Sequence, residues 1–198
     1  MKKEYLFVKI CYDWKNEFKG QVMKHLLLSC IASVVLIAGN FTLQSNDLKG
    51  QLTKTQEFNG FGCNGQNISP ELHWSDAPKG TKSFAITVYD PDAPTGSGWW
   101  HWQVVNIPAT ATSISTDASA KHTLPKGAVE ITNDYGTVGF GGACPPVGDK
   151  PHTYIVTVHA LDVETLPVEV GTNAPIVGYQ INAHTIEKAS LVSYYGRE

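Results

Sequence analysis

The segment of residues 84–107 (FAITVYDPDAPTGSGWWHWQVVNI) constrains the fold of this 198-residue chain more than any other segment. It begins and ends with runs of aromatic and β-branched residues, 84–89 and 102–107, which predict two buried strands. The intervening DPDAPTGSGWW contains two prolines and two glycines, which do not fit regular structure. If the two strands pair, the acid Asp90 and the imidazole His101 lie at the same end of one sheet. We therefore expect a functional site at that end.

A simpler interpretation treats these residues as a turn and a core. Asp and Pro are common in turns, because Asp caps nearby backbone N–H groups and Pro fixes φ, and Asp92 fits that role. Tryptophans are usually core residues, which applies to Trp99, Trp100 and Trp102. His101 favours a site, because a turn needs no histidine at its far end and phenylalanine would serve a core better.

A second group of polar residues follows the Gly- and Pro-rich loop 132–151. His152 and Tyr154 lie on one face at the start of a strand predicted from YIVTVHALDV. Two histidines, a tyrosine and the loop N–H groups can donate hydrogen bonds to a small anion, and Asp90 can orient one histidine. The loop glycines in question are Gly139, Gly141 and Gly142. This set suits a phosphate, sulfate or carboxylate head group.

Two other chemistries stay open at this point. Two histidines and one aspartate also make a facial metal triad, and Cys144 with His152 would make a nucleophile pair if the cysteine were free. The sequence contains no P-loop, no dinucleotide-binding glycine motif and no C-x-x-C pair. The remaining histidines are interpreted as structural or solvent-exposed: His73, His122, His159 and His184.

The amino-terminal segment predicts export. Residues 24–39 combine a basic start with the uncharged apolar run LLLSCIASVVLIAG, which is typical of a signal peptide and short for a membrane span. We expect residues 1–22 to be a gene-model extension, residues 23–39 to be the signal peptide, and the mature protein to be periplasmic or secreted without an integral membrane span. The mature chain would keep 9 basic and 15 acidic residues, a balance that disfavours nucleic-acid binding.

The rest of the chain predicts few further elements. Residues 72–74 form a short strand, 108–128 a polar surface loop, 173–188 a single helix and 189–195 a last strand. Two cysteines, Cys63 and Cys144, remain after the signal peptide and predict a disulfide, with two buried thiols as the alternative.

Several of these motifs, in this order, resemble the phosphatidylethanolamine-binding protein family, and most closely its bacterial Raf-kinase-inhibitor-like branch. The stretches that carry the resemblance are SPELHW, GTKSFAITVYDPDAPTGSGWWHW, VVNIP, GGACPP, PHTY and YYGR, spread over residues 55–196. The resemblance implies one domain over residues 40–198. It implies a mainly β fold, an antiparallel β-sandwich with Greek-key topology and one or two short helices.

The resemblance also implies an anion pocket. In this sequence its residues are Asp90, Asp92, Pro94, His101, Gly142, Pro146, His152 and Tyr154. Two departures from the family pattern stand out. Cys144 replaces the glycine of G-P-P, so that a cysteine lines or backs the pocket, and Thr153 replaces the arginine of H-R-Y, which removes a basic residue from the pocket rim.

These observations predict a non-enzymatic binding protein that needs no cofactor. The expected ligand is a small anionic or phosphate-bearing molecule; a protein partner, which the protein would inhibit or modulate, and a homodimer are also expected. The alternative is a hydrolase that uses the Asp/His pocket, with or without a metal. We expect anion affinity to require a protonated histidine and to weaken as pH rises through about 6.5. We also expect His152, as a rim residue, to contribute little to folding.

Overall fold

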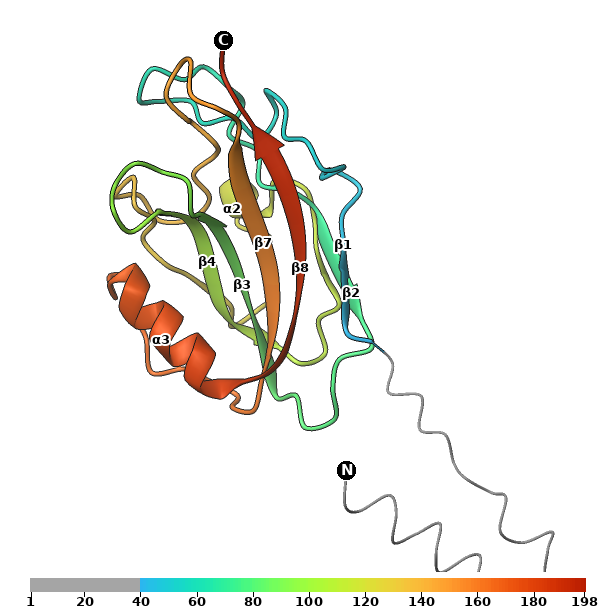
Figure 1. The fold of residues 1–198 in the computed structure, drawn as a ribbon. Coiled ribbons are helices and arrows are strands. Elements are labelled where there is room, and N and C mark those ends of the chain that lie inside the picture. The colour runs from blue at the N-terminus through green and yellow to red at the C-terminus, as the bar shows by residue number, and fades with distance from the viewer. Residues whose placement is uncertain (1–39) are drawn as a thin grey trace, which may run out of the picture. The chain divides into compact units, whose positions relative to one another are not determined.

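Two antiparallel sheets pack face to face in residues 40–198, the part of the chain that the computed structural model describes (Figure 1). The predictions for residues 1–22 and for the signal peptide 23–39 lie outside these residues. The small sheet has the order β1-β2-β5, formed by Thr42–Gln44, Leu72–Ser75 and Ser113–Ile114. The large sheet has the order β6-β4-β3-β7-β8, formed by Val129–Glu130, Trp99–Pro108, Ser83–Asp90, His152–Leu161 and Thr185–Tyr195.

The strand order confirms the predicted Greek key. Strand β7 follows β6 in the chain after a long connection, yet it pairs with β3, so that the spatial order is β7-β3-β4-β6. The two helices are short, as expected: α2 spans Ala118–Lys121 and α3 spans Ala174–His184. Neither helix among residues 40–198 is long and apolar enough to cross a membrane.

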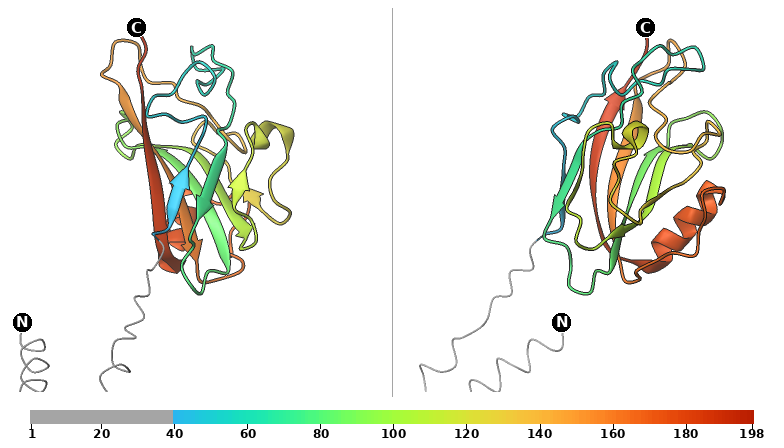
Figure 2. Two further views of the ribbon diagram at one scale, coloured as in Figure 1. Left: turned by 90° about the vertical axis from the view of Figure 1, so that its right-hand side faces the viewer. Right: turned by 180° about the vertical axis from the view of Figure 1, so that it is seen from behind.

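The alternation of side chains along β3 explains how the layers pack. Phe84, Ile86 and Val88 face the small sheet, where they join a core that includes Leu43 and Trp74. Ala85 points to the opposite face, where a second apolar cluster contains Val177 and Ile181 of α3. Both faces of the large sheet are therefore buried along its central strand, β3. Figures 1 and 2 show α3 and the small sheet on opposite sides of the large sheet.

The helix prediction was wrong at its carboxyl end. Helix α3 stops at His184, four residues before the predicted end, and β8 begins directly at Thr185. The β-branched residues Thr185 and Ile186 favour a strand, and pairing with β7 along residues 152–161 supplies a full ladder of hydrogen bonds. Tertiary pairing therefore overrides the local helical pattern.

The predicted surface loop 108–128 also contains structure. It holds β5 and α2, and it buries Ile114 and Ala118 in the main core. Strand β4 begins at Trp99, three residues earlier than predicted, because Trp99 and Trp100 pair with Asp90 and Tyr89. The apolar run of β4 therefore extends into the segment assigned to irregular structure.

Alanine substitutions at two glycines test this packing, because we expect them to change the free energy of unfolding in opposite directions. Alanine at Gly178, inside α3, would place its Cβ 3.6 Å from Trp100, an ordinary contact, and would remove the glycine penalty of a helix interior. We expect Gly178→Ala to raise the free energy of unfolding by about 0.5–1 kcal/mol in urea denaturation. Gly142→Ala should lower it by about 2 kcal/mol or more, because its Cβ would overlap the backbone of Gln56. Destabilisation by Gly178→Ala would mean that α3 packs more tightly on the sheet than described.

Candidate functional site

A buried carboxylate–imidazole pair joins the ends of β3 and β7. His152 Nδ1 lies 2.8 Å from Asp90 Oδ2, and both side chains are only 3% exposed. The other carboxylate oxygen, Asp90 Oδ1, accepts hydrogen bonds from the backbone N–H groups of Asp92 at 2.8 Å and Ala93 at 3.1 Å. Asp90 therefore caps the turn and orients a histidine at once, so that the turn interpretation and the site interpretation both apply to it.

The burial of His152 overturns one expectation. Its imidazole is buried, and Asp90 would be left as a buried charge without its partner if the ring were removed. Such a loss costs several kcal/mol. His152 is thus a structural residue as well as a cavity residue, and the prediction that it supports little of the fold was wrong.

Asp92 fastens the loop rather than facing the cavity. Its Oδ2 accepts a hydrogen bond from the Thr153 backbone N–H at 2.8 Å, and its Oδ1 lies 3.3 Å from Lys150 Nζ. Hydrogen bonds from Thr153, with a smaller effect of Lys150, hold the pKa of Asp92 below its ordinary value. The carboxylate therefore ties the segment after β3 to the start of β7.

His101 is buried and neutral. Its Nδ1 lies 2.7 Å from the Gly141 carbonyl oxygen and must donate to it, so that Nε2 carries the lone pair. That Nε2 is buried without a hydrogen-bond partner among residues 40–198. Burial lowers the pKa of His101 to about 4, although the Gly141 carbonyl and the Asp90 charge oppose the shift. His101 is therefore not the protonated histidine that we expected to bind an anion near neutral pH.

The loop glycines do not offer their N–H groups to a ligand, contrary to the prediction. The N–H of Gly139 donates to Ile131 O at 3.3 Å and that of Gly141 to His101 O at 2.9 Å. The N–H of Gly142 donates to Asn67 Oδ1 at 2.7 Å. Gly142 instead permits close approach, because a Cβ there would overlap the backbone of residues 56–57.

Tyr154 lies behind the site. Its side chain is 1% exposed, and its ring centroid is 5.2 Å from that of His101. The hydroxyl is buried without a hydrogen-bond partner among the described residues. Burial, with a contribution from the negative charge of Asp90, raises the pKa of Tyr154 above its ordinary value. Tyr154 therefore packs against His101 from the core.

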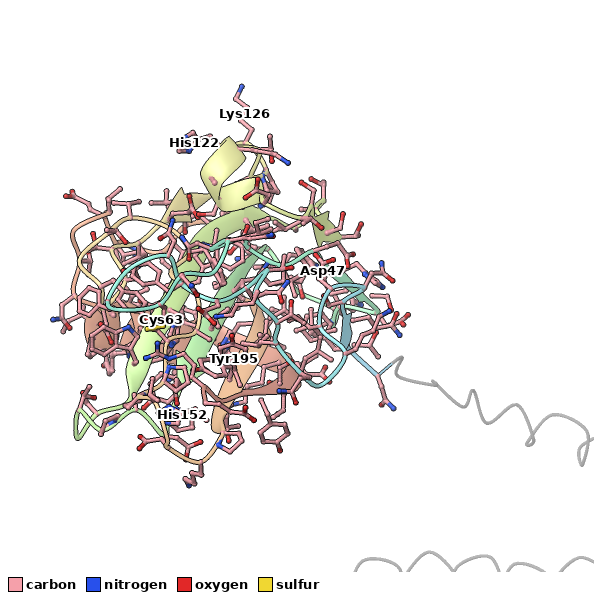
Figure 3. The ribbon with its side chains drawn as sticks, turned by 90° about the horizontal axis from the view of Figure 1, so that it is seen from above. Asp47, Cys63, His122, Lys126, His152 and Tyr195 are labelled. Atoms are coloured by element: carbon pink, nitrogen blue, oxygen red, sulfur yellow. A yellow bond between two sulfur atoms is a disulfide. The ribbon has the colours of Figure 1, made fainter. Side chains whose placement is uncertain are left out.

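These residues surround a cavity of about 260 Å³ at the end of the large sheet. Figure 3 shows His152 at this end of the molecule, near Cys63 and Tyr195. Five of the eight predicted pocket residues line the cavity: Asp90, Pro94, His101, Pro146 and His152. Asp92, Gly142 and Tyr154 do not. The other lining residues are Phe61, Ala93, Thr95, Trp99, Tyr135, Cys144, Pro145 and Arg197.

Arg197 supplies the positive charge of the cavity. Its Nε donates to the Pro145 carbonyl at 2.7 Å and its Nη1 to the Gly62 carbonyl at 3.0 Å, so that it joins two loops. A guanidinium has five N–H donors, and the others remain for a ligand. Thr153 was expected to leave the cavity rim without a basic residue, but that expectation missed Arg197, which lines the cavity. The only signal in the sequence was the arginine in YYGR.

Aromatic rings form one wall of the cavity. Tyr135 stacks on Phe58 with centroids 3.9 Å apart, and it also contacts Trp99 at 5.1 Å and Phe61 at 5.2 Å. The Tyr135 hydroxyl donates to the Gly142 carbonyl at 3.0 Å. Trp99 Nε1 is buried without a partner among residues 40–198. The wall thus offers mainly apolar surface.

The loop that carries Phe61 is anchored from two sides. The Cys63 and Cys144 sulfurs lie at bonding distance, with their Cα atoms 5.9 Å apart. Glu57 is fully buried and accepts hydrogen bonds from Lys54 and Tyr195 and, at 3.0 Å, from the Asn64 backbone. Burial opposes its ionisation, but these hydrogen bonds outweigh burial and hold the pKa of Glu57 below its ordinary value.

The metal-triad alternative gains no support from the geometry. Within residues 40–198, no group of three or more His, Cys, Asp and Glu side chains is arranged to hold a metal ion. His152 uses Nδ1 for Asp90, and His101 uses its own Nδ1 for a backbone carbonyl.

Comparisons with known proteins agree with this architecture. Residues 45–196 match the family described as phosphatidylethanolamine-binding protein. The chain is 52% identical to the UPF0098 protein YbcL of Escherichia coli over 87% of this chain and 98% of YbcL. It is 46% identical to YbhB of the same organism over 77% of this chain and 98% of YbhB.

Two solved structures show the same fold. The crystal structure of Escherichia coli YbcL, described as a member of the mammalian PEBP family, matches with a TM-score of 0.78 and 54% identity over 80% of this chain and 99% of that chain. The homologue CT736 of Chlamydia trachomatis matches with a TM-score of 0.66 and 29% identity over 80% and 98% of the two chains.

The low pKa of His101 predicts acid-sensitive stability. An unfolded histidine takes up a proton near pH 6.5, whereas buried His101 resists protonation until about pH 4. Stability is therefore fully present above pH 6.5 and is lost as pH falls towards 4, by roughly 3 kcal/mol from this group. We expect His101→Gln, which can keep the hydrogen bond to Gly141, to reduce the slope of the unfolding free energy against pH between pH 6.5 and 4.5; buried His159, whose pKa is also lowered to about 4, accounts for part of the remaining slope.

Exposed His122 provides the matched control. His122→Asn suits the left-handed backbone at that position and should leave the pH dependence as in the wild type. An unchanged slope in His101→Gln would show that His101 titrates normally in the folded protein.

Proposed function

Because the chain belongs to the phosphatidylethanolamine-binding protein family, we propose that its cavity binds a small phosphate-bearing or carboxylate-bearing molecule without turning it over. The observation that carries this proposal is the placement of Arg197 in a cavity whose other charges are already satisfied. The Asp90 carboxylate already accepts hydrogen bonds from two backbone N–H groups and contacts His152 Nδ1. An arriving anion therefore meets a guanidinium with free donors and a carboxylate that is already occupied.

The remaining lining groups suit an anion with an organic part. The rings of Phe61, Trp99 and Tyr135 line the cavity and offer apolar surface beside Arg197. Ligand sites of this kind combine a mostly apolar wall with a few polar groups that fix orientation. Inorganic phosphate would use only the polar groups, so we expect it to bind more weakly than a phosphorylated organic molecule.

Binding rather than hydrolysis is supported by the absence of a ready nucleophile in the lining. The Cys144 sulfur is turned to Cys63, and the Thr95 hydroxyl donates to the Gly98 carbonyl at 2.5 Å. The protein partner and the homodimer remain predictions.

We also propose that the protein is exported and that Cys63 and Cys144 form a disulfide in its mature form. Two observations support this: the apolar run at residues 24–39, and a Cα separation of 5.9 Å, which suits a bridge. Disulfides persist mainly in oxidising compartments such as the periplasm.

Arg197 provides the direct test of the anion proposal. We expect Arg197→Gln to weaken the binding of phosphorylethanolamine about tenfold, because one charge-assisted hydrogen bond contributes about 1.5 kcal/mol or more. The measurement is an NMR titration of the mature protein with phosphorylethanolamine, inorganic phosphate and ethanolamine in separate arms.

Lys150→Gln is the matched control, because Lys150 is exposed and pairs with Asp92 outside the cavity. It should bind phosphorylethanolamine as the wild type does. If ethanolamine binds as well as phosphorylethanolamine, or if both variants lose affinity equally, the proposal of an anion site at Arg197 is wrong.

The cysteine pair has its own test. We expect thiol titration of the denatured, unreduced mature protein to find neither Cys63 nor Cys144 reactive. Reduction should lower the free energy of unfolding by roughly 4–5 kcal/mol in the chain-entropy account of an 81-residue separation, less any strain. Two reactive thiols in protein isolated from the periplasm would refute the bridge and reopen the nucleophile alternative.

A further inference from the structure

A second cavity of about 190 Å³ lies on the face of the large sheet that packs against α3, opposite the face that packs against the small sheet. None of the residues that line it lines the first cavity, and none lies in the loops around the first cavity. Sheet positions 87, 157 and 159 form its floor, and Gly178, Ile181 and Asn182 of α3 form one side. Figures 1 and 2 show α3 on this face of the sheet, away from β1 and β2.

Hydrogen-bond donors are in excess around this cavity. Lys188 lines it, is exposed, and has no carboxylate partner among residues 40–198. The Asn182 side chain makes no hydrogen bond within the same residues. Thr157 Oγ1 and Ser190 Oγ lie 2.8 Å apart and share one hydrogen bond. Only one of the two hydroxyl groups donates in that bond, so the hydrogen of the other hydroxyl is left over. No acidic residue lines the cavity.

His159 at the cavity floor adds no counter-charge. The Thr185 hydroxyl donates to the Ile181 carbonyl at 2.7 Å, so it accepts from His159 Nδ1 at 3.3 Å. His159 Nε2 then carries the lone pair, with only a long contact of 3.4 Å to Thr87 Oγ1. Burial, together with the charge of Lys188, lowers the pKa of His159 to about 4. The ring is neutral near pH 7, and the net charge of the cavity is that of Lys188.

An aromatic pair closes one end of the cavity. The rings of Tyr89 and Trp100 lie 4.5 Å apart. Gly178 of α3 lies close to the Trp100 indole, and both residues line the cavity. The cavity therefore places an unpaired cation and free donors beside a flat apolar surface.

We propose that this second cavity binds a small carboxylic acid with a planar aromatic body, independently of the first cavity. The carboxylate pairs with Lys188 and accepts from Asn182 and the spare hydroxyl of Thr157 and Ser190. The aromatic body packs on Trp100 beside Gly178. A carboxylate is the complement of a site with surplus donors and no acid, and a flat ring is the complement of an open indole face.

The test is an NMR titration of the mature protein with phenylacetate, using the assigned indole resonances of Trp99 and Trp100 to separate the two cavities. We expect phenylacetate to shift the Trp100 and Thr157 resonances. Phenethylamine, which has the same ring with the opposite charge, should bind more weakly. Lys188→Gln should weaken phenylacetate binding about fivefold, as expected for one partly exposed ion pair. Because Lys188 is exposed, this variant should keep a wild-type amide spectrum.

Arg197→Gln separates the two sites, since it alters only the first cavity. It should leave the phenylacetate shifts at Trp100 unchanged. Three results would overturn the proposal: no shift at Trp100, shifts confined to Trp99 and the first cavity, or equal phenylacetate affinity in Lys188→Gln and the wild type.

Discussion

The contact between Asp90 and His152 holds the candidate site together. It joins the end of β3 to the start of β7, two neighbouring strands of the large sheet that are far apart in sequence. The same carboxylate fixes the turn after β3 through the N–H groups of Asp92 and Ala93. Because the pair is buried, removing either partner leaves an uncompensated polar group. The position of the cavity wall is therefore coupled to the stability of the sheet.

The other walls of the cavity are held by equally local interactions. His101 and Gly141 exchange hydrogen bonds, which places the Gly-rich loop over β4. Arg197 bonds to the carbonyls of Pro145 and Gly62, and the cysteine pair joins the same two loops. The cavity walls are thus held by bonds within the protein, a preorganisation that favours the proposed binding. Most polar groups near the cavity take part in these bonds, and Arg197 is the donor that the proposal assigns to the ligand.

The sequence predicted the features that depend on strong local patterns. The runs of aromatic and β-branched residues in β3 and β7 placed Asp90 and His152 at strand ends, and the ends of antiparallel neighbours meet at one end of the sheet. Features set by distant pairing were missed. Arg197 reaches the cavity because the chain after β8 bridges to Val147, a contact with no local signal. The glycine N–H groups were misassigned because their acceptors lie on other strands and loops. Helix α3 ends early because β7 pairs with Thr185 onwards.

The most direct test of this account is a crystal structure of the mature protein with bound phosphorylethanolamine. We predict that the phosphate lies within hydrogen-bond distance of the Arg197 guanidinium. The Asp90–His152 contact should stay near 2.8 Å. A phosphate bound away from Arg197, or a His152 ring turned from Asp90 to the ligand, would contradict the account.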